Sequence, residues 1–242
     1  MAMRILLTND DGIYAEGMKT LMEWAKTIGE IVVYAPKVEQ SAKAHAIEIH
    51  KPFEAKQVQL YDGTTGWAVD STPADCVRFA ILGRKEPFDL VISGVNRGLN
   101  IGMDVNYSGT VSAAFEAALL GVKAMAVSTE PMGFDTARKH LPEVWNEISA
   151  RRMIEKAAIL NVNIPHEVKE EGILITHQGG PYYSDEFPHI GNDMYRPTGY
   201  SVHKSREDYT LDTDATLSGH ITITPLHVDR TDWRVYEALK GE

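Results

Sequence analysis

Strand-like apolar runs alternate with helical stripes over the first two thirds of this 242-residue sequence. The predicted buried strands occupy residues 4–8, 31–35, 89–93, 125–128 and 160–164. Between them, Met18, Leu21, Met22 and Ala25 recur at helical spacing, as do apolar residues over 111–122. This alternation predicts an α/β fold with a mostly parallel sheet and helices on both faces.

The C-terminal third has a different pattern. Residues 200–204, 210–214 and 220–225 are β-rich, and a helix is predicted only over 231–239. Strand pairs of this kind are marginally stable alone and need to pack on a core or on another subunit. We therefore predict a catalytic core over residues 1–180 and a C-terminal β-hairpin extension over residues 181–242.

The bulk composition excludes several classes of function. A net charge of -10 argues against a partner that is a nucleic-acid polymer, because phosphate backbones are bound by Lys and Arg surfaces. Cys76 is the only cysteine, so no internal disulfide can form, as is typical of a reducing cytosol. The first apolar run is too short for a signal peptide, and no segment approaches the roughly 18 apolar residues of a membrane helix. We expect a soluble, cytoplasmic protein without a membrane partner.

Two adjacent aspartates follow the first predicted strand. Asp10, Asp11 and Gly12 end the run Arg-Ile-Leu-Leu-Thr-Asn-Asp-Asp-Gly. Ligands of open α/β sheets bind outside the carboxyl ends of the strands, so both acids are expected at the mouth of a site. Such a pair is costly to ionise without a cation, and hard carboxylate ligands suit Mg²⁺ or Mn²⁺. The alternative interpretation is that one aspartate caps the next helix while the other is solvated.

Three further segments carry side chains that could bind a cation or a phosphate. Two of them follow predicted strands, and the third begins a helix. Ser41 follows the second strand, where its hydroxyl could ligate a metal, contact a phosphate or simply form a turn. Asn96 and Asn100 lie among glycines after the strand 89–93, in a loop that resembles neither a dinucleotide fingerprint nor a Walker A motif. Their amides could ligate a cation or donate to phosphate, unless the segment is only a glycine-rich surface loop.

The segment Ser108-Gly109-Thr110 precedes the clearest amphipathic helix in the sequence. Backbone N–H groups at a helix N-terminus, with hydroxyls beside them, form an anion site. Simple N-capping by Ser108 would look identical in sequence. Taken together, these segments indicate metal-assisted phosphoryl chemistry more strongly than any one of them does.

Other residues with reactive side chains are interpreted as structural. The nine histidines are scattered without a His-x-x-x-His pair, which argues against a zinc site. Cys76 lies on the apolar stripe of a helix and is interpreted as a core residue. Ser112 and Glu116 lie one helical turn apart, and we interpret them as solvated or interface residues.

With these residues assembled, the sequence closely resembles the SurE family of survival-protein phosphatases, the 5′/3′-nucleotidases. The matching segments span almost the whole chain in the family's order: 5–12, 35–41, 71–77, 91–100, 107–116, 161–165 and 223–226. The resemblance implies a Rossmann-like core and a C-terminal β extension exchanged between the subunits of a homodimer or homotetramer.

The resemblance also implies a divalent-metal-dependent phosphomonoesterase that hydrolyses nucleoside 5′- and 3′-monophosphates, and it leaves short polyphosphate open as a further substrate. One Mg²⁺ or Mn²⁺ per subunit would be held by Asp10, Asp11, Ser41 and Asn96. Phosphate would be bound by Asn96 and Asn100 together with the segment 108–110, that is Ser108, Gly109 and Thr110. Catalysis would rest on Asp10, Asp11 and Asn96, with either aspartate as the proton acceptor.

The sequence departs from the family pattern beside one proposed ligand. The family commonly has glycine after the serine, whereas this chain has Ala42 after Ser41, which restricts the backbone there. The main alternative to the nucleotidase hypothesis is a nucleotide-sensing protein that holds its ligand without hydrolysis. Nucleotide binding without phosphate release would favour that alternative.

Overall fold

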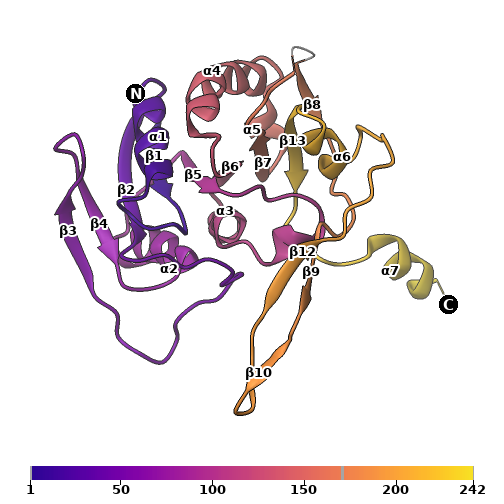
Figure 1. Ribbon diagram of the computed structural model, residues 1–242. Helices are drawn as coiled ribbons and strands as arrows, with labels where there is room; N and C mark the ends of the chain where they lie inside the picture. The colour runs from indigo at the N-terminus through magenta and orange to yellow at the C-terminus, as the bar shows by residue number, and fades with distance from the viewer. Residues whose placement is uncertain (1, 170–171, 242) are drawn as a thin grey trace.

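The computed structural model, which describes residues 2–169 and 172–241, is built on a nine-stranded central sheet (Figure 1). In sheet order the strands are β3 (Ala55–Gln59), β4 (Thr65–Val69), β2 (Glu30–Pro36), β1 (Arg4–Thr8), β5 (Leu90–Arg97), β6 (Lys123–Thr129), β7 (Ile159–Ile164), β13 (Ile221–Leu226) and β8 (Ile173–Ile175). The strands from β4 to β7 all pair in parallel, whereas β3 is antiparallel to β4 and β13 to β7. The predicted mostly parallel sheet is confirmed.

Helices cover both faces of this sheet, as predicted. Helices α1 (Glu16–Ala25) and α4 (Phe134–Ala150) pack on one face, and α2 (Pro73–Arg78) and α3 (Gly109–Leu119) pack on the other (Figure 1). Successive side chains of β1 point to opposite faces of the sheet. Ile5 and Leu7 belong to the core under α1 and α4, and Leu6 belongs to the core under α2 and α3. A strand that is buried on both faces reads as a continuous apolar run, which explains the sequence of β1.

Shorter elements complete the connections. They are a π-helical turn (Phe79–Gly83), a 3₁₀ helix (Gly102–Asn106) and helix α5 (Met153–Lys156). Cys76 is buried inside α2, and Thr72 caps that helix by accepting the N–H of Asp75 at 3.1 Å. Among the described residues, no helix combines the length and hydrophobicity that crossing a membrane requires.

The order of the strands reverses at β1. From β1 the chain passes through α1 to β2 on one side, continues to the β3–β4 hairpin, and returns through α2 to β5 on the other side of β1. The connecting helices α1 and α2 therefore lie on opposite faces, and the loops that follow β1 and β5 diverge. Such a switch point opens a crevice at the carboxyl ends of the strands, where α/β proteins bind ligands.

The chain after residue 180 forms an arm and then returns to the sheet. Strands β9 (Tyr183–Glu186) and β12 (Thr198–Ser201) form an antiparallel pair, which continues to a tip made by β10 (His189–Gly191) and β11 (Met194–Tyr195) (Figure 1). Helix α6 (Asp212–Leu217) and β13 then return to the main sheet. The domain boundary near residue 180 stays a prediction.

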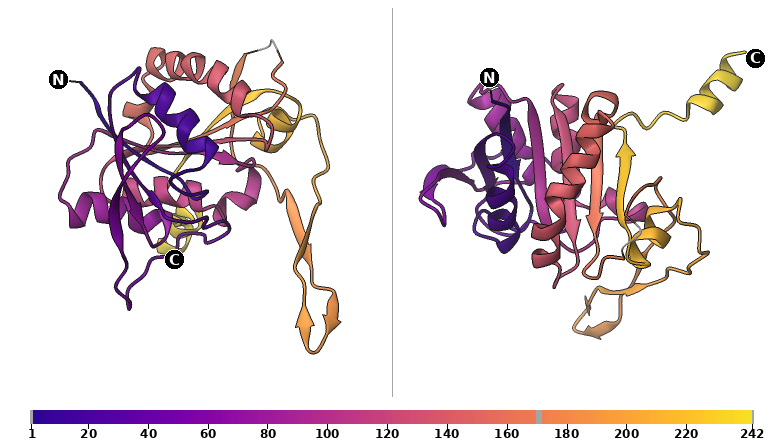
Figure 2. Two further views of the ribbon diagram at one scale, coloured as in Figure 1. Left: turned by 60° about the vertical axis from the view of Figure 1, so that its left-hand side comes forward. Right: turned by 90° about the horizontal axis from the view of Figure 1, so that it is seen from above.

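Two details of the C-terminal region can be compared with the sequence pattern. The helix predicted over 231–239 is α7 (Trp233–Lys240), which has no buried residue and stands away from the sheet (Figure 2). The strand predicted over 210–214 is wrong, because Asp212 begins α6. Its buried carboxylate accepts the N–H groups of Gly102 and Gly179, and these bonds favour the helical turn over an extended strand.

The packing of α1 on β5 leaves no space for a side chain at Gly17, where a Cβ atom would lie 1.8 Å from the carbonyl oxygen of Val95. We expect Gly17→Ala to lower the free energy of unfolding by about 3 kcal/mol, because backbone must move in both elements. Urea unfolding measures the change. Gly180→Ala is the control, since a Cβ there meets no atom within 4 Å. Equal midpoints for the two variants would contradict the prediction.

Candidate functional site

The structure gathers the predicted segments around Asp10 and Asp11, at the switch point between β1 and β5. Three hydrogen bonds connect them. The hydroxyl of Thr110 donates to Asp10 Oδ1, the N–H of Arg97 donates to Asp11 Oδ2 at 3.1 Å, and the N–H of Gln40 donates to the carbonyl oxygen of Asp10 at 2.7 Å. The loop after β2, the end of β5 and the start of α3 therefore all contact the two aspartates.

The start of α3 lies directly against Asp10. Ser108 is the N-cap of the helix, since its hydroxyl accepts the N–H of Val111 at 3.1 Å. A Cβ atom at Gly109 would lie 2.9 Å from both Cβ and Oδ2 of Asp10, so glycine is required for this close approach. The capping interpretation of Ser108 is confirmed. Phosphate binding by the segment 108–110 stays a prediction.

Asn96 lies at the end of β5 with its amide held in one orientation. Its Nδ2 donates to the carbonyl oxygen of Gly98 at 2.8 Å. This bond uses the nitrogen end of the amide and leaves the oxygen Oδ1 as the end that can ligate a cation. The residue is half-buried and directly precedes Arg97, whose N–H contacts Asp11.

Asn100 is held by the sheet rather than by the aspartates. It is buried, its Nδ2 donates to the hydroxyl of Ser128, and its N–H donates to Asn163 Oδ1. In return, its carbonyl oxygen accepts from the side-chain amides of Asn161 and Asn163. These bonds fix the glycine-rich loop to β6 and β7. The predicted contact of Asn100 with phosphate stays a prediction.

Ser41 lies on the exposed loop after β2. Its hydroxyl donates to Glu39 Oε1 at 2.7 Å, a partner that the sequence motifs do not indicate. Ala42 has a φ of 56°, in the left-handed region, where a residue with a Cβ is disfavoured by about 1–2 kcal/mol. The glycine that the family commonly carries at this position suits that conformation, and this chain retains the conformation with alanine.

The electrostatics of the aspartate pair are unusual. Burial, together with the charge of Asp11, raises the pKa of Asp10 to about 6, although the hydrogen bond from Thr110 opposes the rise. Burial also raises the pKa of Asp11, to which the charge of Glu39 adds and which the N–H and charge of Arg97 oppose. The protein therefore does not fully compensate the negative charges of the two carboxylates, and a bound cation would stabilise them.

The chemistry of the predicted donor set fits a hard divalent cation. Asp10 and Asp11 would supply carboxylate oxygens, Ser41 a hydroxyl and Asn96 an amide oxygen, which is an oxygen-only set that suits Mg²⁺ or Mn²⁺ with water in the remaining positions. Within residues 2–169 and 172–241, no three His, Cys, Asp or Glu side chains are grouped as metal ligands. The candidate centre therefore depends on just two carboxylates and on neutral oxygens.

A cavity of about 370 Å³ opens beside Asp11. It combines carboxylates, one guanidinium and an apolar wall, so a ligand in it would lie next to the candidate metal centre. Its lining residues are Asp11, Ala15, Glu16, Gly17, Glu39, Arg97, Pro131 and Phe134.

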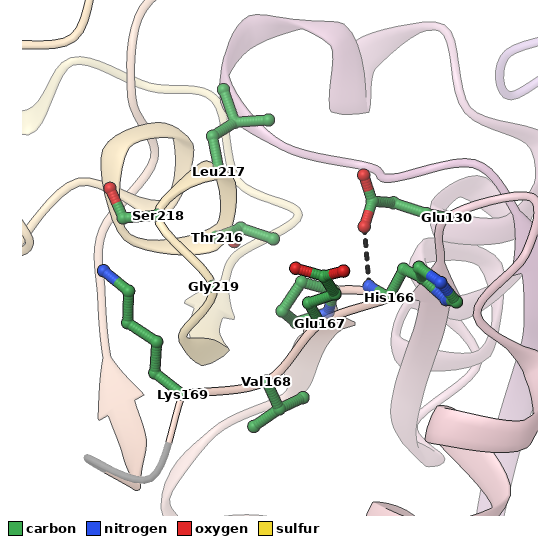
Figure 3. Close-up of a pocket in the computed structure, with 10 residues that line it drawn as sticks. Glu130, His166, Glu167, Val168, Lys169, Thr216, Leu217, Ser218 and Gly219 are labelled. Carbon is green, nitrogen blue, oxygen red and sulfur yellow. Dashed lines mark hydrogen bonds between the residues drawn. The ribbon is translucent and has the colours of Figure 1, made fainter.

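A second cavity, of about 480 Å³, lies between the loops after β6 and β7 and the turn from α6 to β13 (Figure 3). Glu130 lines this cavity and accepts the N–H of His166 at 2.6 Å, while the next residue, Pro131, lines the first cavity. None of the predicted site residues lines the second cavity. The geometry therefore favours the first cavity as the substrate site.

Glu116 is not a solvated residue, so that part of its interpretation as a solvated or interface residue is wrong, and the interface alternative stays a prediction. Its carboxylate is buried and accepts from His45 Nε2 at 2.8 Å and from Arg78 Nη1 at 2.9 Å. Burial acts to raise the pKa of Glu116, but these two hydrogen bonds outweigh it and hold the pKa below its usual range. Ser112 is likewise buried. The partners of Glu116 are distant in sequence, so local spacing contains no signal for them.

Known proteins with similar sequences share one family. The family described as "Survival protein SurE" matches residues 5–185. The chain is 41% identical to the 5'-nucleotidase SurE of Caldanaerobacter subterraneus subsp. tengcongensis, over 98% of this chain and 94% of that protein. It is also 41% identical to the 5'-nucleotidase SurE of Carboxydothermus hydrogenoformans, over 98% of this chain and 95% of that protein.

A solved structure has the same overall arrangement. The crystal structure of the SurE protein from Aquifex aeolicus superposes with a TM-score of 0.79 at 31% sequence identity, covering 98% of each chain. The likeness thus extends over nearly the full length of both chains, including the region after β8.

The raised pKa of Asp10 predicts a pH dependence of stability in metal-free protein. The folded chain binds this proton more tightly than the unfolded chain, whose aspartate has the ordinary pKa of 3.8, so the free energy of unfolding should fall as pH rises from 3.8 to about 6. The fall should total about 2–3 kcal/mol. Asp10→Asn removes the titrating group and should be more stable than the parent above pH 6, with the difference closing near pH 4.

Urea unfolding in EDTA between pH 4 and pH 8 measures this difference. Asp135→Asn is the matched control, because that side chain is 96% exposed on α4. A difference between Asp10→Asn and the parent that stays constant with pH would contradict the assignment.

Proposed function

The chain belongs to the survival protein SurE family, and we propose that it is a nucleotidase that hydrolyses nucleoside 5′- and 3′-monophosphates with the help of a divalent metal. The relatives named 5'-nucleotidase SurE, aligned over nearly the whole chain, support the nucleotidase activity. The observation that carries the metal dependence is the incompletely compensated pair of Asp10 and Asp11 at the switch point. The substrates are nucleoside monophosphates, and short polyphosphate is a further candidate because the centre addresses only the phosphoryl group.

One Mg²⁺ or Mn²⁺ per subunit would be held by the four oxygen donors, Asp10, Asp11, Ser41 and Asn96. Such an ion supplies charge to polarise a phosphoryl oxygen and to lower the pKa of a water molecule. The protein supplies their fixed positions: Thr110 holds Asp10, the N–H of Arg97 holds Asp11, and Gly98 orients the amide of Asn96.

The remaining chemistry belongs to side chains and backbone groups of the chain. Either Asp10 or Asp11 would accept the proton of an attacking water, since both carboxylates lie at the proposed metal centre. The first N–H groups of α3 lack partners within the helix. The N–H of Thr110 donates to the Asp10 carboxylate, so the N–H of Gly109 is the one that would donate to a phosphate oxygen. The side-chain amides of Asn96 and Asn100 each have a second hydrogen beyond the ones that donate to Gly98 and Ser128. With the N–H of Gly109, these hydrogens would stabilise the charge that spreads over the equatorial oxygens during in-line attack.

The cavity beside Asp11 suits the nucleoside portion of the substrate. Phe134 and Pro131 offer an apolar wall for the base, and the carboxylates of Glu16 and Glu39 can accept hydrogen bonds from ribose hydroxyls. Arg97 adds a positive charge beside the phosphate position. The cavity volume of about 370 Å³ lies within the usual range of small-molecule sites.

The projecting parts of the chain support a proposed homodimer or homotetramer. The arm from β9 to β12 exposes Tyr183, Phe187 and Tyr195, and α7 exposes Trp233 and Leu239. Aromatic side chains gathered on elements that do not pack on the sheet are typical of subunit contacts.

Asp10→Asn should reduce nucleotidase activity by more than about a hundredfold, because it removes both the charge and a ligand at the centre of the site. Phosphate release is measured from nucleoside 5′- and 3′-monophosphates and from tripolyphosphate, with Mg²⁺, with Mn²⁺ and with EDTA. Asp135→Asn should retain the parent rate, since its carboxylate is solvent-exposed. Retained activity in Asp10→Asn would overturn the assignment. Tight nucleotide binding without phosphate release in the parent would instead indicate a sensing protein.

Phe134→Ala should lower kcat/KM for nucleoside monophosphates about tenfold, since stacking of a base on an aromatic ring contributes roughly 1–3 kcal/mol. Hydrolysis of glycerol 2-phosphate, which has no base, should be unchanged and serves as the internal control. An equal loss for both substrates would show that Phe134 acts on the phosphate site or on folding rather than on the base.

A further inference from the structure

The loop that carries Ser41 is fastened to two helices along much of its length. This loop, residues 37–54, connects β2 to β3 and contacts α2, its N-cap and α3. Ala44 donates its N–H to the carbonyl oxygen of Tyr107 at 3.1 Å, and Thr72 donates its hydroxyl to the carbonyl oxygen of Ala46 at 2.7 Å. The N–H of Glu48 donates to Asp75 Oδ2 at 2.8 Å. These contacts hold a segment that has no regular secondary structure of its own.

Among the described residues, the side chain of His45 joins the loop to a buried charge, that of Glu116. His45 is partly buried at 25% side-chain exposure, whereas the Glu116 carboxylate is only 5% exposed. The two lie 71 residues apart in sequence and meet at 2.8 Å. Arg78 holds the other oxygen of the same carboxylate. A buried carboxylate with two donors of this kind is a rigid anchoring point.

Helix α3 connects this anchor to the candidate metal centre. Thr110, in its first turn, donates to Asp10, and Glu116 lies less than two turns further along the same helix. The helix therefore sets both the position of Asp10 and the position at which the loop is attached. Ser41 precedes His45 by about one short turn of chain, so its reach toward the aspartates depends on that attachment.

We propose that His45 is a positioning residue, whose bond to Glu116 holds the loop so that the Ser41 hydroxyl completes the metal site. This inference rests on the proposed metal-dependent function. The sheet does not depend on the bond, because Arg78 continues to compensate the buried Glu116 charge when His45 is replaced. Loss of His45 should therefore release the loop and weaken metal binding while the fold persists. A buried charge that loses all of its partners would instead destabilise the fold strongly.

The test compares His45→Ala, His45→Gln and the parent in two measurements. Isothermal titration of metal-free protein with Mn²⁺ reports the affinity of the site, and limited trypsin digestion after the exposed Lys43 reports release of the loop. We expect His45→Ala to bind Mn²⁺ about tenfold more weakly, the scale of losses when a partner that orients a metal ligand is removed. Cleavage after Lys43 should accelerate, and His45→Gln, which can still donate to Glu116, should restore both properties.

A double variant separates positioning from general damage. Ser41→Ala combined with His45→Ala should bind Mn²⁺ no more weakly than Ser41→Ala alone, because both changes remove the same ligand. His140→Ala is the matched control, since His140 contacts Glu143 at 2.9 Å on α4 and holds no loop. Should His45→Ala not fold, as judged by thermal unfolding, His45→Asn gives the same comparison with a donor too short to reach Glu116.

Two results would overturn the proposal, and they differ from failure of the proposed function. Unchanged Mn²⁺ affinity in His45→Ala, with Lys43 cleaved faster, would show that the loop position does not matter to the site. Additive losses for Ser41→Ala and His45→Ala would show that the two residues act separately. A parent protein that binds no Mn²⁺ would instead overturn the metal-dependent function on which the inference rests.

Discussion

The position of β1 between β2 and β5 determines where this molecule can form a binding site. Because the chain leaves β1 on one side and returns on the other, its connecting helices lie on opposite faces and a crevice opens between the loops. Asp10 and Asp11 follow β1 into that crevice. The loop after β2 and the end of β5 reach them through Gln40 and Arg97. The topology therefore decides which segments can share a site before any side chain is considered.

The site is organised around a carboxylate that the protein does not fully stabilise. Asp10 is buried beside a second aspartate, and its main partner is a neutral hydroxyl, that of Thr110. In the absence of a cation this arrangement costs stability, because burial disfavours the charged form. Functional sites commonly retain such unfavourable groups, since the same incomplete compensation creates affinity for a ligand. An anionic substrate would also need the cation, given the carboxylates of Glu16 and Glu39 nearby.

Helix α3 connects that site to the loop that carries Ser41. It is held at its start by Ser108, contacts Asp10 through Thr110, and buries Glu116 beneath the loop that carries Ser41. One rigid element thus relates two proposed metal ligands that come from different loops. Rigid elements position functional groups more accurately than loops do. Attachment to α3 would therefore hold the loop that carries Ser41 in a defined position.

Local sequence was enough to predict the buried parallel strands and the aspartate pair at a strand end, because hydrophobic periodicity acts over a few residues. It left open whether Ser108 caps α3 or belongs to an anion site. It did not indicate the β3–β4 hairpin or α4, whose interior contains Pro142 and whose first turn supplies Phe134. Long-range packing accounts for the return of β13 to the sheet, the helix at 212–217 and the burial of Glu116. These features depend on partners far apart in the chain, and packing of the whole fold, rather than local spacing, brings such partners together.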